Sequence, residues 1–152
     1  MRLKSVWISD YKNLRDFTLT FDGESFLDIF VGKNGTGKSN FFEALVEIFN
    51  FTFASKKKRS DIGFDFDILY EMGGQDVRIC RRDHQMQVNG KNRATVPDTL
   101  TPDNVIIYYS GHSNTIASTV DQYAKAYARR NRNWAGDEVR EFISIGTEYA
   151  KR

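Results

Sequence analysis

The sequence predicts an α/β fold built around one glycine-rich loop, with an antiparallel β-meander beside it and helices toward the C-terminal end. Three observations support this prediction. An apolar run at residues 26–31 stops just before three glycines, and an amphipathic helical pattern begins within them. Short segments in which apolar and polar residues alternate follow, separated by turn signals. Aromatic residues, which favour strands, make up 14% of the chain.

The first elements are two short strands that we expect to pair as a hairpin. Residues 3–8 form the first strand, and residues 14–22 form the second because large apolar side chains alternate there with polar ones. Gly23 ends the pattern. The nearly continuous apolar run at residues 26–31 then predicts a buried strand, in which Asp28 is the one polar residue.

A helix is predicted to begin at Lys38, since Phe41, Leu45 and Ile48 fall at helical spacing while Glu43 and Glu47 take the other side. After a basic loop, the meander is predicted to comprise strands at 64–71, 76–80 and 84–88. Its turns are expected at Gly73-Gly74 and Asn89-Gly90. Residues 104–111 predict a second buried strand, and the segments 119–134 and 136–152 predict two helices.

The glycine-rich loop carries the chemistry. Residues 32–39 read Gly-Lys-Asn-Gly-Thr-Gly-Lys-Ser and match the phosphate-binding pattern G-x-x-x-x-G-K-[ST]. Glycines let the backbone adopt positive φ angles and approach phosphate oxygens closely, and the following helix adds the positive end of its dipole. Lys38 would supply a full charge to the β- and γ-phosphates, and the Ser39 hydroxyl would be a Mg²⁺ ligand. The strand expected before the loop and the helix after it favour a nucleotide site over a plain turn.

Composition excludes several classes of protein. The chain has 22 Lys and Arg against 20 Asp and Glu, a net charge of +2 with a pI of about 8.6, which does not by itself indicate nucleic-acid binding. One cysteine, Cys80, excludes an internal disulfide and a cysteine-cluster metal site. No apolar run approaches the ~20 residues of a membrane span, and the N-terminus lacks the apolar core of a signal peptide. We therefore expect a cytoplasmic protein without a membrane partner.

Residues 31–40, VGKNGTGKSN, resemble the Walker A loop of the SMC/RecF/ABC branch of P-loop ATPases. The opening hairpin of that branch is similar as well, with matches at Ile8, Tyr11, Lys12 and Leu14. Asp10 is a departure, since the branch often has Asn there. The order of hairpin, buried strand, phosphate loop, helix and meander also agrees. Within the branch, the segment IIYYSG (106–111) resembles ATPases of bacterial anti-phage systems of the OLD and Septu kinds.

The resemblance implies the N-terminal lobe of a P-loop NTPase head of ABC type. Such a head binds ATP and Mg²⁺, dimerises with a second copy around two nucleotides, and acts with a nuclease or other effector subunit. Residues 1–112 would be the N-terminal half of the head, and residues 113–152 a helical segment or the start of an insertion or coiled-coil arm. Transferred residue by residue, Ser39 would hold Mg²⁺, Lys12 would lie near the nucleotide, and the phosphate loop would comprise Gly32, Asn34, Gly35, Thr36, Gly37, Lys38, Ser39 and Asn40.

Two motifs of such a head are missing. A Walker B motif is an apolar run ending in Asp-Glu, which holds Mg²⁺ and orients the attacking water; residues 104–109 have the run without the acids. Residues 71–76, EMGGQD, imitate the L-S-G-G-Q signature, but a hairpin turn explains their glycines. A Q-loop glutamine is also missing after residue 109, where Ser110, His112 or Asn114 would have to replace it. We therefore identify no catalytic residue and interpret the chain as half of a head, either a piece of a longer protein or one product of a split gene.

Two hypotheses about function follow. The first is an ATPase acting in a DNA-processing or anti-phage complex, which the intact Lys38 and Ser39 favour for the complete protein. The second is an ATP-sensing, non-hydrolysing assembly platform for an effector, which the missing Walker B motif favours for this chain alone. A small P-loop kinase is disfavoured by the antiparallel meander. DNA contact is an alternative to a solvated loop for two basic runs, residues 129–132 and Lys56, Lys57, Lys58 and Arg59.

Overall fold

A computed structural model describes residues 1–23, 27–53, 61–102, 104–108 and 141–145 of the chain. The chain divides into two compact units, Met1–Thr101 and Pro102–Arg152, which are described separately. The basic runs at 56–59 and 129–132, the three Q-loop candidates and the helix expected at 119–134 lie outside the described residues. The predicted domain boundary at residue 112 also lies there and stays a prediction.

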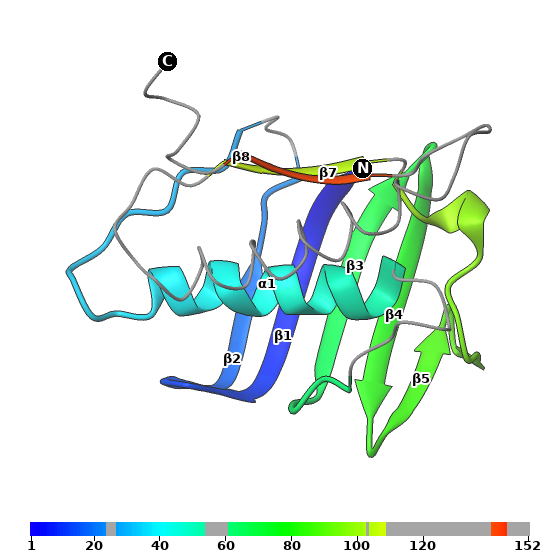
Figure 1. The fold of residues 1–152 in the computed structure, drawn as a ribbon, viewed down its shortest axis with the longest axis horizontal. Coiled ribbons are helices and arrows are strands. Elements are labelled where there is room, and N and C mark those ends of the chain that lie inside the picture. The colour runs from blue at the N-terminus through cyan, green and yellow to red at the C-terminus, as the bar shows by residue number, and fades with distance from the viewer. Residues whose placement is uncertain (24–26, 54–60, 103, 109–140, 146–152) are drawn as a thin grey trace, which may run out of the picture. The chain divides into compact units, whose positions relative to one another are not determined.

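The first unit contains a six-stranded sheet in which every neighbouring pair is antiparallel (Figure 1). The predicted hairpin and meander are both confirmed, and β1 joins them because it pairs with β2 on one side and β3 on the other. The turns at Gly73-Gly74 and Asn89-Gly90 have positive φ at both residues, as tight hairpin turns require. In spatial order the strands are β2 (Leu14–Thr20), β1 (Arg2–Tyr11), β3 (Phe66–Met72), β4 (Gln75–Arg82), β5 (Gln85–Val88) and β6 (Lys91–Asn92).

Helix α1 (Lys38–Phe53) packs on one face of this sheet and forms the core with it (Figure 1). The sheet contributes alternate side chains from β1, β3 and β4, and the helix contributes Phe41, Leu45, Ile48 and others. Full burial of one such side chain stabilises the fold by about 1.5–3 kcal/mol. Glu43 differs from the prediction: its side chain is only 5% exposed. A short 3₁₀ helix, η2 (Asp98–Leu100), closes the unit where its Leu100 carbonyl accepts a hydrogen bond from the Tyr70 hydroxyl.

The buried strand expected at residues 26–31 is not observed. Residues 27–31 have no regular secondary structure, and Leu27, Ile29 and Val31 are 73%, 75% and 87% exposed. Only Phe30 turns toward the core, where its ring contacts the rings of Phe21, Phe41 and Phe42. A strand needs a neighbour for its backbone groups, and among the described residues none pairs with this segment.

The second unit contains a two-stranded parallel sheet formed by β7 (Asn104–Tyr108) and β8 (Glu141–Ile145). Strand β7 confirms a strand over the first five of the expected residues 104–111. Strand β8 corrects the prediction of a helix at 136–152, at least over its own five residues. The sequence EFISI is rich in β-branched and aromatic residues, and β7 supplies a ladder partner along its whole length, so strand propensity and pairing outweigh the helical pattern.

Candidate nucleotide-binding site

The glycine-rich loop leads directly into α1, as predicted, and its glycines meet steric requirements. Gly35 and Gly37 have φ angles of +84° and +97°, which side-chain-bearing residues rarely adopt. A Cβ atom at Gly37 would also lie 3.0 Å from both the Asn13 Oδ1 and the Leu14 Cδ2 atoms. At Gly32 the same atom would lie 3.3 Å from the Thr36 hydroxyl oxygen. The motif therefore uses glycine where a positive φ angle or a close neighbour disfavours a side chain.

The Lys38 side chain folds back over the loop that precedes it. Its amine donates to the carbonyl oxygens of Gly32 (2.5 Å) and Lys33 (2.8 Å). The Lys33 carbonyl also accepts from the Thr36 hydroxyl (2.9 Å) and, over 3.4 Å, from the Thr36 N–H. The loop thus curls around the Lys38 ammonium group, which places a positive charge beside its backbone.

The N-terminus of α1 reinforces this positive character. The first helical hydrogen bond of this end is donated by the Phe41 N–H to the Gly37 carbonyl (2.8 Å). The preceding N–H groups, of Lys38, Ser39 and Asn40, therefore have no acceptor inside the helix. No acidic residue lies in the first turn to oppose the positive end of the helix dipole. Ser39, the residue after Lys38, is exposed, so its hydroxyl is accessible to a metal ion from solution.

The turn between β1 and β2 lies against the loop and the helix. The Asn13 amide nitrogen donates to the Gly35 carbonyl (3.2 Å), and its amide oxygen accepts from the Asn40 side chain (2.7 Å). Lys12, which has a positive φ of 53°, forms an ion pair with the buried Glu43 of α1. Lys12 is therefore held at the helix, and its predicted place near a nucleotide stays a prediction.

A second carboxylate of α1 anchors the strand that leads into this turn. The Tyr11 hydroxyl donates to Glu47 (3.0 Å). Burial, followed by the charges of Glu47 and Glu43, raises the pKa of Tyr11. The hydroxyl therefore keeps its proton at neutral pH and remains a donor.

The predicted phosphate-loop residues lie in the continuous segment 32–40, which ends in the first turn of α1. Sequence reasoning missed Asn13 and Glu43. Asn is a common turn residue, so the sequence could have placed Asn13 in a turn, but nothing in it indicates that the turn would touch the loop. The sequence does not indicate that Glu43 is buried, because its partner Lys12 lies 31 positions away.

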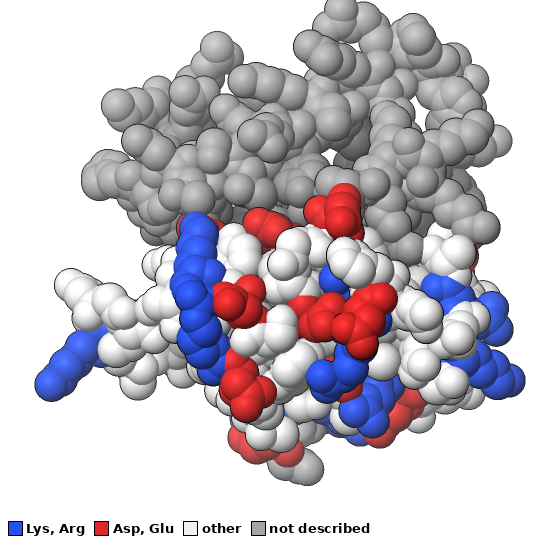
Figure 2. Space-filling view, turned by 90° about the horizontal axis from the view of Figure 1, so that it is seen from below, with Lys and Arg blue, Asp and Glu red and all other residues white. Residues whose placement is uncertain are grey.

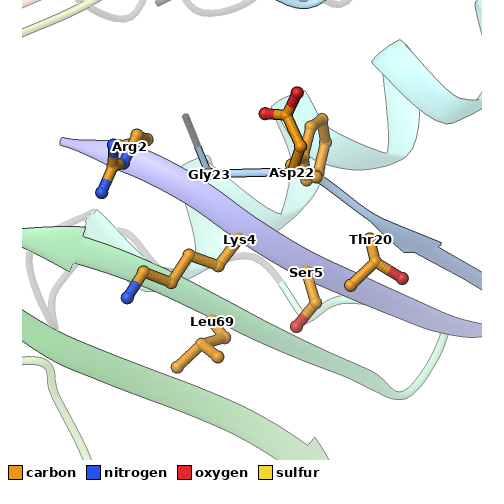
Figure 3. A pocket seen from close by; sticks show the side chains of 8 residues that line it. Arg2, Lys4, Ser5, Thr20, Asp22, Gly23 and Leu69 are labelled. Atoms are coloured by element: carbon orange, nitrogen blue, oxygen red, sulfur yellow. The ribbon is translucent and has the colours of Figure 1, made fainter. Parts of the chain in front are cut away.

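A second group of basic side chains, at a hollow elsewhere on the described surface, is already neutralised by acidic neighbours. A hollow of about 340 Å³ lies around the first residues of β1, and Figure 3 shows Arg2 and Lys4 among the side chains that line it. These two cations are already paired, Arg2 with Glu71 (2.7 Å) and Lys4 with Asp76 (2.5 Å). The glycine-rich loop lies instead beside the turn that follows the last residue of β1.

Acidic and basic side chains are intermingled on the face shown in Figure 2, and that face carries no broad patch of a single sign among the described residues. Within the same residues, no helix combines the length and the apolar character that a membrane crossing requires.

Comparison with known proteins gives consistent relatives. A sequence family described as an AAA ATPase domain matches residues 1–151. The chain is 24% identical, over 146 residues, to the DNA replication and repair protein RecF of Clostridioides difficile (strain 630); the match covers 94% of this chain and 38% of that protein. It is 31% identical, over 81 residues, to structural maintenance of chromosomes protein 3 of Caenorhabditis elegans, covering 53% of this chain and 6% of that protein.

A solved structure of the recombination mediator protein RecF with ATP, from the RecFOR pathway, is 17% identical to this chain. It matches with a TM-score of 0.42, over 86% of this chain and 44% of that one. The chain therefore spans less than half the length of each of these relatives.

Proposed function

The chain belongs to the AAA ATPase domain family and is an SMC/RecF-like P-loop ATPase head, and from this premise we propose that residues 32–40 bind the triphosphate of ATP. The observation that carries the proposal is the position of the Lys38 amine, between the carbonyl oxygens of Gly32 and Lys33. A triphosphate would replace these neutral acceptors with charged oxygens, so that Lys38 would gain the attraction between opposite charges in addition to its charge-assisted hydrogen bonds.

Three further features support the same site. The dipole of the 16-residue helix α1 places roughly half a positive charge at its N-terminus. The positive φ angles of Gly35 and Gly37 allow N–H groups of the loop to converge on a phosphate. The exposed Ser39 hydroxyl stands where a Mg²⁺ ion bound to the phosphates could use it as one ligand. When bound, Mg²⁺ would neutralise part of the phosphate charge, while Lys38 and the backbone donors hold the remaining oxygens.

The test is a calorimetric titration of the 152-residue chain with ATP. Lys38→Ala should weaken ATP binding by about 2–3 kcal/mol, the scale of a hydrogen bond to a charged group. The matched control is Lys91→Ala, which removes the same charge from an exposed residue of β6. This strand lies at the opposite edge of the sheet from β2, whose turn with β1 contacts the loop. Equal affinities of the Lys38 variant and the wild-type chain would refute the assignment of the site.

For the complete protein we propose ATP hydrolysis by a dimer of two heads, coupled to DNA processing, repair or anti-phage defence through a nuclease or other effector subunit. One relative is a DNA replication and repair protein, which supports the DNA role, and the segment IIYYSG supports the defence role. The alternative is an ATP-sensing, non-hydrolysing platform. It is favoured by one observation: the residues that follow β7 are Tyr-Ser-Gly, with no acidic pair.

A further inference from the structure

The turn between β1 and β2 reaches the phosphate loop through one side chain, Asn13. This side chain makes two hydrogen bonds, one to the Gly35 carbonyl (3.2 Å) and one from the Asn40 amide (2.7 Å). A carbonyl can only accept, so the Asn13 amide nitrogen must face Gly35 and its oxygen must face Asn40. Gly35 lies within the loop and Asn40 in the first turn of α1, so Asn13 links two points of the segment that would surround a phosphate.

Asn13 determines which way the peptide group between Gly35 and Thr36 faces. In a trans peptide the C=O and N–H bonds point in opposite directions. Because Asn13 holds the Gly35 carbonyl, the Thr36 N–H points the other way, toward the Lys33 carbonyl. That carbonyl also accepts from the Lys38 amine. The Thr36 N–H is therefore directed to the same side of the loop as the Lys38 ammonium, the full positive charge of the motif.

The turn itself is held firmly enough to act as a support. Leu14, the next residue, is 4% exposed and belongs to the core. Lys12, the preceding residue, is paired with the buried Glu43. The Asn13 side chain also approaches the loop closely, since its oxygen would lie 3.0 Å from a Cβ atom at Gly37.

We propose that Asn13 is a positioning residue of the nucleotide site, which keeps the Thr36 N–H turned toward the triphosphate. The inference rests on the proposed binding of ATP at residues 32–40. Gly35 has no Cβ atom, so its backbone can rotate easily once the Asn13 hydrogen bond is lost. Asn13 acts through the loop rather than through the ligand, and Asn40 helps by fixing the orientation of the Asn13 amide.

The test compares two ligands, ATP and inorganic tripolyphosphate, in titrations of the full 152-residue chain. Asn13→Ala should weaken both by about fivefold to tenfold, the equivalent of one net hydrogen bond. Asn13→Asp should weaken both further, because it replaces the donor with a charged acceptor facing the Gly35 carbonyl. The matched control is Asn89→Ala, which also removes a turn asparagine. The Asn89 side chain accepts a hydrogen bond from the Arg78 N–H (2.8 Å), and its turn joins β5 and β6, at the opposite edge of the sheet from β2. This variant should leave both affinities unchanged.

Two results would overturn the inference. One is an Asn13→Ala variant with wild-type affinity for both ligands. The other is a loss confined to ATP, which would mean that Asn13 contacts the nucleoside instead of positioning the loop. If Lys38→Ala abolishes binding while Asn13→Ala does not weaken it, only this inference fails; if Lys38→Ala also has no effect, the proposed function fails.

A second variant keeps the test valid if Asn13→Ala does not fold. Asn40→Ala keeps Asn13 itself and removes the partner of its oxygen, so a smaller loss of about twofold to threefold is expected for both ligands. The double variant should bind no more weakly than Asn13→Ala, since the two residues act in one chain of contacts. Additive losses of affinity in the double variant would contradict the proposed support of the loop. An Asn40→Ala variant with wild-type affinity would contradict it as well.

Discussion

Gly37→Ala should destabilise the chain more than Gly35→Ala, although the two glycines lie two residues apart in the same loop. Both have positive φ angles, +97° and +84°, so each substitution carries a backbone penalty of roughly 1–2 kcal/mol. They differ in their surroundings. A Cβ atom at Gly37 would lie 3.0 Å from atoms of Asn13 and Leu14, whereas nothing lies within 4 Å of one at Gly35. Leu14 belongs to the core and cannot yield freely, so overpacking adds about 1–3 kcal/mol at Gly37 alone.

The two variants form their own controls. Alanine reduces the freedom of the unfolded chain equally in both, so this contribution cancels in the difference between them. Urea unfolding with linear extrapolation should give a loss of about 1–2 kcal/mol in unfolding free energy for Gly35→Ala, and about 2–5 kcal/mol for Gly37→Ala. Losses that agree within about 0.5 kcal/mol would show that the turn does not press on the loop, and would remove the packing basis of the site.

Three further predictions concern stability and the metal. Burial raises the pKa values of Tyr11 and Tyr70 above the ordinary 10.0, so the contribution of these two side chains to the unfolding free energy should be constant below about pH 10 and should fall as the pH rises further. A series of urea titrations at alkaline pH measures this fall, and Tyr11→Phe should lessen it. Arg81→Ala should cost about 1–3 kcal/mol of unfolding free energy, because it leaves the Phe64 carbonyl without the hydrogen bond that a side chain only 4% exposed donates to it. Arg82→Ala, which loses a stacking contact with an indole ring, should cost about 0.5–1 kcal/mol. Ser39→Ala should weaken ATP binding in the presence of Mg²⁺ and leave metal-free binding nearly unchanged in calorimetry; equal losses would argue against the metal role.

The glycine-rich loop at the start of α1, the helix itself and the meander were predictable because their signals are local. A spacing of eight residues specifies the loop, helical periodicity specifies α1, and the glycine pairs specify the turns of the sheet. The prediction of a buried strand at 26–31 was wrong because hydrophobicity indicates a preference for burial without identifying the partner that would provide it. The prediction of a helix over 141–145 was wrong because the pairing of this segment with β7 depends on residues far away in the sequence.

The candidate site shows the same division between local and distant information. The motif identifies Lys38 and Ser39, but the contact between Asn13 and Gly35 joins residues 22 positions apart. No periodicity or short motif encodes such a contact, since it arises only when the hairpin and α1 pack together.

The central claim is tested most directly by measuring ATP binding and phosphate release in the same samples of the 152-residue chain. Saturable binding that depends on Lys38, with no appreciable phosphate release at any protein concentration, is the expected result. Lys38 and the loop can hold the triphosphate, but the sequence has no Walker B carboxylate to orient water, and such positioning terms change rates by orders of magnitude. Absence of binding would contradict the site. Rapid release abolished by Lys38→Ala would contradict the account of catalysis and direct attention to the carboxylates of Asp65, Asp67 and Asp103, of which Asp65 and Asp67 are paired with arginines in the structure.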